Sequence, residues 1–217
     1  MDINKNQKKI TLAVPKGRIL EELSPLFSRI GIIPEADFFD ENSRKLIFNS
    51  NIDFLEIVKV RSFDVATFVK YAGADLGICG LDVIKEFADE DFFTTLNLNI
   101  GNCRLSIAGS QNLIDNNWQT KSHLRIATKY PNITSKFFAS QGIQTEIIKL
   151  NGAIEIASKL QLCDYIVDLV SSGRTLKENN MIEIIKIIDV SSHLIINKNS
   201  LKNFNYLINQ IISLFDE

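Results

Sequence analysis

The 217-residue sequence is poor in the residues that most catalytic and metal sites require. It contains only two histidines, His123 and His193, and three cysteines, Cys79, Cys103 and Cys163. These positions do not have the spacing of a zinc site or of a Cys-His nucleophile. The cysteines are odd in number and widely spaced, which is typical of core side chains in a reducing compartment. Any chemistry is therefore expected to proceed without thiol or imidazole groups.

The sequence also lacks a cationic cluster and a long apolar run. The net charge is −2 and the isoelectric point is near 5.8, so a nucleic acid is not an expected partner. The first nine residues are polar, and no apolar run approaches the about 20 residues that a membrane-spanning helix needs. With 45% hydrophobic and 23% charged residues, the chain is expected to be a globular cytoplasmic protein of one or two domains.

Short β-strand patterns alternate with amphipathic helical patterns, the order typical of an α/β protein. Strands are expected at residues 9–14, 46–48, 54–60, 75–79, 92–98, 103–108, 124–129, 145–150, 165–170, 181–188 and 193–197. Helices are expected at residues 19–30 with a kink at Pro25, at 62–72, from Gly80, at 132–141, after Gly152, from Thr175, and from Ser200 as the cap of the last helix. The polar segment 110–122 is expected to be a surface connection in which Trp118 packs or contacts a partner.

The most informative segment is residues 164–179, in which an apolar run containing a carboxylate ends in a turn rich in hydroxyl groups and glycine. Residues 165–170 predict a buried strand, and the helix that begins near Thr175 has amides without intrahelical partners. Such a turn attracts anions through free N–H groups, hydroxyls and charge. The groups available here are those of Ser171, Ser172, Gly173, Arg174 and Thr175. Asp168, just before the turn, is suited to accept hydrogen bonds from ribose hydroxyls. The segment therefore predicts a phosphate-binding loop.

An ordinary strand-to-helix turn is the alternative interpretation of this loop, because any α/β protein needs several such turns. Neither stricter nucleotide-binding signature is present. No Gly-x4-Gly-Lys-Ser/Thr occurs, and residues 77–80 lack the third glycine of the dinucleotide fingerprint. The loop alone leaves both interpretations open.

Seven segments, taken in order along the chain, resemble one protein family. They are residues 12–20 (LAVPKGRIL), 43–48 (SRKLIF), 73–83 (GADLGICGLDV), 103–106 (CRLS), 125–131 (RIATKYP), 150–155 (LNGAIE) and the phosphate loop. Together they resemble the ATP phosphoribosyltransferases, which open histidine biosynthesis, in their short form. The family often has Asn-Gly after the phosphate helix, whereas this chain has Asn179-Asn180. Since asparagine tolerates the left-handed conformation, the turn is expected to survive.

The resemblance implies a two-domain, periplasmic-binding-protein-like α/β fold with the active site in the interdomain cleft. Domain I would comprise residues 1–102 plus 188–217, and domain II, with the phosphate loop, residues 103–187. Long-form members append a regulatory domain for which a chain ending at Glu217 has no room. The short form works instead with a separate regulatory subunit that resembles histidyl-tRNA synthetase, so a dimer within a hetero-oligomer is expected.

The reaction implied by the resemblance joins N1 of ATP to the anomeric carbon of phosphoribosyl pyrophosphate and expels pyrophosphate, with Mg²⁺ held mainly by substrate and no protein ligand expected. Asp168 and residues 171–175 would hold the ribose and the 5′-phosphate. Arg18, Arg44 and Lys45 would act in catalysis by stabilising developing charge. The implied ATP-binding residues are Lys16, Asp82, Gly152 and Glu155. An acid at a helix start also complements the helix dipole, so Asp82 and Glu155 have a purely structural alternative.

Three rival classes remain open at this point. A type I phosphoribosyltransferase shares a carboxylate-plus-Thr-Gly loop, but that loop usually carries two adjacent acids, and here Asp168 follows Val167. A non-catalytic small-molecule-binding module of the periplasmic-binding-protein kind would bind without turnover. A purely structural subunit is disfavoured by the clustered hydroxyl, glycine and arginine chemistry.

Overall fold

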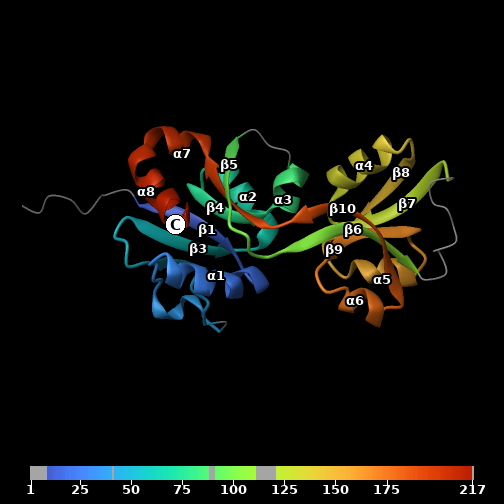
Figure 1. Ribbon diagram of the computed structural model, residues 1–217, viewed down its shortest axis with the longest axis horizontal. Coiled ribbons are helices and arrows are strands. Elements are labelled where there is room, and N and C mark those ends of the chain that lie inside the picture. Colours follow the sequence, from blue (N-terminus) through green and yellow to red (C-terminus); the bar gives the residue numbers. More distant parts are fainter. Residues whose placement is uncertain (1–8, 41, 88–90, 111–120, 217) are drawn as a thin grey trace, which may run out of the picture. The chain divides into compact units, whose positions relative to one another are not determined.

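The computed structural model describes residues 9–40, 42–87, 91–110 and 121–216. The chain forms two compact units: unit 1 is Met1–Ile84, Ala88–Gly101 and Ser191–Glu217, and unit 2 is Lys85–Phe87 and Asn102–Val190. Each unit is built around one β-sheet with helices on both faces (Figure 1). Trp118 and most of the expected surface connection lie outside the described residues.

The sheet of unit 1 has the strand order β2-β3-β1-β4-β11-β5. Its strands are β1 (Ile10–Pro15), β2 (Ile47–Asn49), β3 (Leu55–Val60), β4 (Leu76–Gly80), β5 (Phe92–Asn97) and β11 (Ser192–Asn197). β1 runs parallel to β3 and to β4, whereas β2, β11 and β5 pair antiparallel with their neighbours. The carboxyl ends of β1, β3 and β4 therefore meet at one edge, which is where α/β sheets place ligands.

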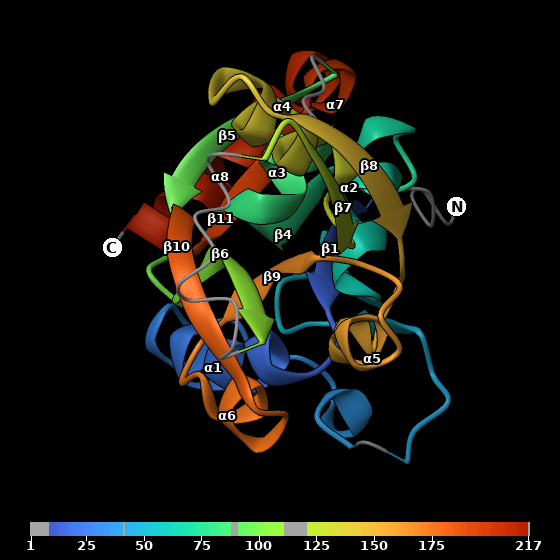
Figure 2. The ribbon, with the colours of Figure 1, turned by 90° about the vertical axis from the view of Figure 1, so that its right-hand side faces the viewer.

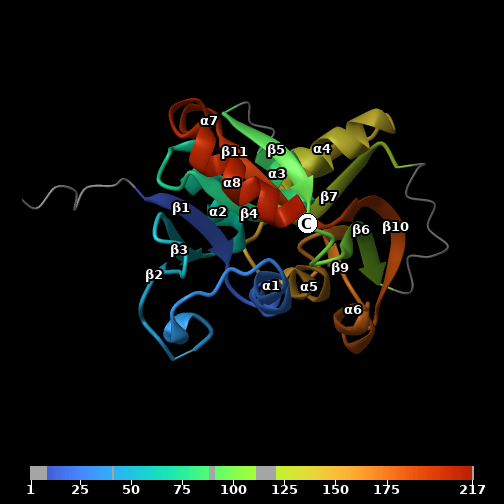
Figure 3. The ribbon, with the colours of Figure 1, turned by 60° about the vertical axis from the view of Figure 1, so that its left-hand side comes forward.

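Helices cover both faces of this sheet. They are α1 (Arg18–Arg29), η1 (Ala36–Phe38), α2 (Ser62–Lys70), α3 (Leu81–Phe87), α7 (Lys198–Asn203) and α8 (Asn205–Asp216). Phe27 of α1 and Ile211 of α8 share one core cluster with Leu12, Ile78 and Leu194, so α1 and α8 cover the same face (Figure 3). The last three residues of α3 belong to unit 2.

Helix α2 covers the opposite face, and Gly77 in β4 lets it approach closely. A Cβ atom at Gly77 would lie 2.7 Å from Val65 Cγ1 and 2.7 Å from Val69 Cγ2. Such contacts are far shorter than van der Waals distance, so only glycine fits between β4 and α2 without a shift.

The sheet of unit 2 has the order β10-β6-β9-β7-β8. Its elements are β6 (Cys103–Ser110), β7 (His123–Thr128), α4 (Pro131–Ser140), β8 (Gln144–Lys149), α5 (Ile154–Lys159), β9 (Tyr165–Val170), α6 (Arg174–Glu178) and β10 (Met181–Val190). β9 runs parallel to β7 and antiparallel to β6. α5 and α6 pack on the face that carries Ile166 and Val170, and α4 lies on the other face (Figure 2).

The expected strands and most of the expected helices are confirmed, but the expectation for Ser200 is wrong. Asn197 caps α7, because its side-chain oxygen accepts from Ser200 N at 2.9 Å. Ser200 lies inside α7 and donates its hydroxyl to buried Asp75 at 2.5 Å. The last helix is also two helices, α7 and α8, instead of one. None of the helices in the described part of the chain is long and apolar enough to cross a membrane.

Candidate active site

The phosphate loop has the strand-turn-helix conformation that the sequence predicts. β9 ends at Val170, and α6 begins at Arg174 after Gly173, which has a left-handed φ of 74°. Glycine adopts this conformation without steric cost. Ser172 Oγ accepts from Arg174 N at 3.4 Å and so closes the turn. The loop hydroxyls are exposed, while the Arg174 side chain pairs with Glu178 of its own helix.

A pocket of about 160 Å³ lies against this loop. Apolar side chains of Ala108, Ile166 and Val170 form part of its wall, and Asp168 and Glu155 add two carboxylates. Glu155 lies in the first turn of α5, which follows Ala153 in the left-handed conformation. The structure therefore brings Glu155 to the loop, whereas Gly152 is not among the residues that line the pocket.

Asp168 lies on β9 directly opposite Ser106 of β6. Because side chains alternate along a strand, Asp168 shares its face with Ile166 and Val170, which α5 and α6 cover. The carboxylate is half-buried, and its Oδ1 accepts from Leu169 N at 2.8 Å. Asp168 thus stands at the pocket with a locally fixed orientation.

An ion-pair network beside the loop was not predicted as part of the site. Arg104 of β6 donates Nε to Glu183 Oε1 at 2.6 Å and Nη2 to Glu183 Oε2 at 2.5 Å. Arg104 Nη1 also donates to Ser171 O at 3.1 Å, and Ser106 Oγ donates to Glu183 Oε1 at 2.7 Å. The hydrogen bond from Arg104 lowers the pKa of Glu183, and the carboxylate raises the pKa of Arg104. The sequence segment CRLS contains both Arg104 and Ser106. Their contacts with Glu183 could not be predicted from the sequence, because they depend on which strands pair.

Lys16 and Arg18 lie at the carboxyl end of β1 in unit 1. Lys16 N donates to Val60 O at 2.9 Å, and Gly17, with φ of 85°, precedes α1. Arg18 Nη2 donates to Gly101 O at 3.3 Å, and its Nε lies 3.6 Å from Glu22 Oε1. Glu22 in turn accepts from Gly101 N at 2.6 Å. Arg18 is therefore tethered to the segment that follows β5.

Arg44 and Lys45 are exposed residues just before β2. Lys45 forms an ion pair with Glu35 and lies 5.6 Å from the centre of the Phe48 ring. Hydrogen bonds from Lys45 and Asn49 lower the pKa of the Glu35 carboxyl to about 2. The Lys45 ammonium group is therefore already paired with a carboxylate in this structure.

Lys59 is a cation that sequence reasoning missed, and its side chain lies over the same Phe48 ring at 4.5 Å. Its Nζ donates to Phe38 O at 2.7 Å, and the residue is only 7% exposed. Burial, with a further contribution from the charge of Lys16, lowers the pKa of Lys59. Lys59 is therefore a buried amine near Lys16 that a backbone carbonyl holds in place.

Asp82 is the second residue of α3, directly beyond the carboxyl end of β4. It is 4% exposed, which makes it less accessible than the other predicted ATP ligands. Burial raises the pKa of the neighbouring Cys79 thiol, with Asp82 as a second cause. Cys79 is therefore a neutral core side chain, as expected.

Comparisons with known proteins decide the family. The family model described as ATP phosphoribosyltransferase matches residues 61–217. The chain belongs to the ATP phosphoribosyltransferase family. It is 47% identical over 207 residues to the ATP phosphoribosyltransferase of Novosphingobium aromaticivorans, covering 95% of this chain and 93% of that protein. It is 52% identical over 193 residues to the enzyme of Sphingopyxis alaskensis, covering 89% and 86%.

A solved structure is similar over nearly the whole chain. It is the ATP phosphoribosyl transferase (HisG:HisZ) complex from Thermotoga maritima, with a TM-score of 0.79, 29% identity, and coverage of 95% of this chain and 96% of that chain. The chain therefore has the two-domain, periplasmic-binding-protein-like α/β fold expected from the sequence. As a member of this family it is a pentosyltransferase, and the reaction is the first step of histidine biosynthesis.

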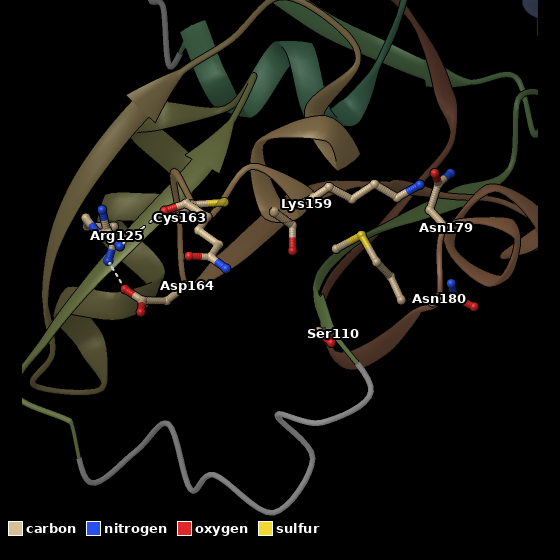
Figure 4. Close-up of a pocket in the computed structure, with 10 residues that line it drawn as sticks. Ser110, Arg125, Lys159, Cys163, Asp164, Asn179 and Asn180 are labelled. Carbon is tan, nitrogen blue, oxygen red and sulfur yellow. Dashed lines mark hydrogen bonds between the residues drawn. The ribbon is translucent and has the colours of Figure 1, made fainter.

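A second depression in unit 2, of about 540 Å³, contains none of the predicted site residues of this transferase (Figure 4). Arg125 and Asp164, near the amino ends of β7 and β9, lie on one side of it, and Lys159 extends toward Asn179 on the other. Because the phosphate loop follows the carboxyl end of β9, the two features lie at opposite ends of that strand.

The turn after α6 has Asn179-Asn180 where the family often has Asn-Gly. Asn180 adopts a left-handed φ of 55°, which confirms that this turn survives without glycine.

Proposed function

We propose that the chain transfers the phosphoribosyl group of phosphoribosyl pyrophosphate to N1 of ATP, giving phosphoribosyl-ATP and pyrophosphate. The observation that carries this proposal is the pocket in unit 2, where the exposed loop of residues 171–175 meets the carboxylates of Asp168 and Glu155. Anion-binding amides and hydroxyls beside a ribose-binding carboxylate are the groups that a phosphoribosyl donor requires. Membership of the family supports the same assignment.

In this proposal the loop binds the 5′-phosphate, and Asp168 accepts hydrogen bonds from the ribose hydroxyls. Lys16, Arg18, Arg44 and Lys45 bind ATP and the departing pyrophosphate, with Glu155, Gly152 and Asp82 as further ATP-site residues. Arginine and lysine suit this task because they offer several donors to phosphate oxygens without needing a proton transfer. These roles come from the resemblance, and those of Asp168 and Arg18 are tested by the substitutions below.

The chemistry needs little from the protein beyond binding and charge. A ring nitrogen of adenine already carries the attacking lone pair, and the transition state resembles an oxocarbenium ion, so neither a protein nucleophile nor a strong base is obligatory. No group of three or more His, Cys, Asp or Glu side chains that could hold a metal ion occurs within the described ranges. Asp168 and Glu155 nevertheless fit Mg²⁺, which binds through one or two carboxylates plus substrate phosphates. Bound mainly by substrate, Mg²⁺ would neutralise charge on the leaving pyrophosphate.

We further propose a regulatory partner subunit and a cytoplasmic location. The similar enzyme from Thermotoga maritima was solved as a HisG:HisZ complex, and a partner of that kind, resembling histidyl-tRNA synthetase, would join a dimer of this chain. Cys79, Cys103 and Cys163 form no disulfide within the described residues, which suits a reducing compartment.

The test is a mass-spectrometric and ultraviolet assay for phosphoribosyl-ATP. Purified protein is incubated with ATP, phosphoribosyl pyrophosphate, Mg²⁺ and pyrophosphatase, with and without the partner subunit and with EDTA as the metal control. We expect product that requires Mg²⁺ and increases with the partner. Tight binding of phosphoribosyl pyrophosphate without product in any condition would favour a non-catalytic binding module.

A further inference from the structure

We propose that Arg104, held in place by Glu183, is a positioning residue for the phosphoribosyl donor, because it fixes the direction of the first peptide group of the phosphate loop. The inference deepens the proposed function and rests on it. Ser171 is the first residue after β9, and Arg104 Nη1 donates to its carbonyl oxygen at 3.1 Å. Arg104 lies on β6 opposite Val170, the last residue of β9. The guanidinium therefore acts on the peptide group at which the strand becomes the loop.

The direction of this peptide group decides whether the loop attracts or repels an anion. In a planar trans peptide the carbonyl oxygen and the N–H of the next residue point in opposite directions. By holding Ser171 O, Arg104 also fixes the direction of the Ser172 N–H, one of the amides available to a phosphate. A carbonyl oxygen turned toward the phosphate would instead place two negative groups together.

Glu183 makes Arg104 rigid enough to do this. Both carboxylate oxygens of Glu183 accept from Arg104, in the bidentate geometry that suits a planar guanidinium. Ser106, which is fully buried, donates to the same carboxylate at 2.7 Å. Ser106 is also the cross-strand partner of Asp168. Arg104, Glu183 and Ser106 thus form one network, which adjoins both Asp168 and the start of the phosphate loop.

If the Arg104–Glu183 ion pair only stabilised the fold, substitution would change the melting temperature more than donor binding. The side chains of Arg104 and Glu183 are 34% and 25% exposed, and partly exposed ion pairs contribute little to stability. The loop conformation depends on the Ser171 contact, so we expect substitution to change donor binding more than melting temperature. The effect should fall on phosphoribosyl pyrophosphate and spare ATP, since Ser171, which Arg104 holds, belongs to the loop proposed to bind the donor.

The experiment measures the dissociation constant of phosphoribosyl pyrophosphate by calorimetry, KM for both substrates, and melting temperature, on the full chain with its partner subunit. We expect Arg104→Gln to raise the dissociation constant and KM for phosphoribosyl pyrophosphate about tenfold, with KM for ATP within about twofold. Arg104→Lys should not restore binding, because an ammonium group cannot replace the guanidinium fork. Arg104→Gln combined with Glu183→Gln should be no worse than Arg104→Gln alone.

Lys186→Gln is the matched control. Lys186 lies on the same strand as Glu183, and its substitution removes one exposed ion pair, to Asp189. The affinity of this variant for the donor should therefore stay within about twofold of wild type. Unchanged donor affinity in Arg104→Gln, or full recovery in Arg104→Lys, would overturn the proposal.

Two further outcomes are covered by the same set of variants. If Arg104→Gln does not fold, Glu183→Gln, which keeps its shape and one acceptor, must weaken donor binding about threefold or more. A wild type that binds phosphoribosyl pyrophosphate without forming product would remove the proposed function. The binding comparison between Arg104→Gln and Lys186→Gln would then still decide the role of Arg104.

Discussion

The proposed ribose ligand, Asp168, lines the pocket from a strand that pairs with a neighbour on each side. We expect Asp168→Asn to lower kcat/KM for phosphoribosyl pyrophosphate about 10- to 100-fold, since a hydrogen bond to a charged group contributes roughly 1.5–3 kcal/mol. The melting temperature should change little, because an amide oxygen can still accept from Leu169 N. Asp53→Asn, at an exposed carboxylate between β2 and β3, is the control, and equal kinetics in the two variants would remove the ribose assignment.

Arg18 offers a second single-residue test, in unit 1. We expect Arg18→Ala to lower kcat/KM about tenfold or more without unfolding the protein, because the guanidinium is partly exposed at the carboxyl end of β1. Arg29→Ala, at the other end of α1, removes the same charge away from that edge and should leave steady-state kinetics unchanged. Loss of activity in both variants would point to α1 stability instead of substrate binding.

The Glu35 carboxyl gives a pH-dependent prediction. Its pKa falls from 4.5 to about 2 in the folded protein, so its stabilising contribution is present above pH 4.5 and is lost as the pH falls toward 2. Glu35→Gln should therefore melt below wild type at neutral pH, and the gap should close between pH 4.5 and 2. Thermal unfolding monitored by circular dichroism across this range checks it; a gap that does not depend on pH would contradict the Lys45–Glu35 pair.

Local sequence was enough to predict the strand, turn and helix of the loop segment, because these elements are adjacent in the chain. It was not enough for the partners of the charged side chains. Glu183 is 79 residues from Arg104 and reaches it only through the pairing of β10 with β6, which contains irregularities in register. The pairing of Lys45 with Glu35 depends in the same way on how the segment before β2 folds back.

At the level of the elements, the contact between α2 and β4 is closely packed. We expect Gly77→Ala to destabilise the protein by about 1–3 kcal/mol, because the new methyl group overlaps Val65 and Val69. The urea midpoint measures the effect. Gly152→Ala, whose Cβ meets nothing within 4 Å, serves as the stability control. Similar midpoints for the two variants would show that α2 moves away from the sheet at little cost.

Short apolar runs predicted the strands, because strands covered on both faces bury nearly all of their side chains, as β4 does. The last helix was predicted wrongly for a tertiary reason. Ser200 looks like a cap, but Asp75 from a distant segment takes its hydroxyl, and Asn197, whose Nδ2 also donates to Val69 O at 2.7 Å, supplies the cap. Contacts that come from elsewhere in the chain decided between two equally suitable capping residues.

At the scale of the whole molecule, the two units have separate buried clusters: one packs α1 and α8 on the sheet of unit 1, and another packs α5 and α6 on the sheet of unit 2. Composition allowed either one core or two, since it reports only how much apolar surface can be buried. The seven family-like segments predicted the two-domain fold, because their order along the chain identified a family whose fold is known. Residue counts contain no information on order. The proposed function assigns the 5′-phosphate to unit 2, and a measurement on the whole chain tests this.

Hydrogen-exchange mass spectrometry with phosphoribosyl pyrophosphate provides that measurement. A ligand at a hundredfold excess over its dissociation constant stabilises the bound state by about 2.7 kcal/mol, and amides that open locally at the site slow accordingly. We expect slower exchange in residues 165–181, around the loop and α6. Ribose 5-phosphate, which lacks the pyrophosphate, should protect the same segment at higher concentration, because it retains the 5′-phosphate and the ribose. Protection confined to unit 1 would instead assign the 5′-phosphate to the cations at Lys16 and Arg18.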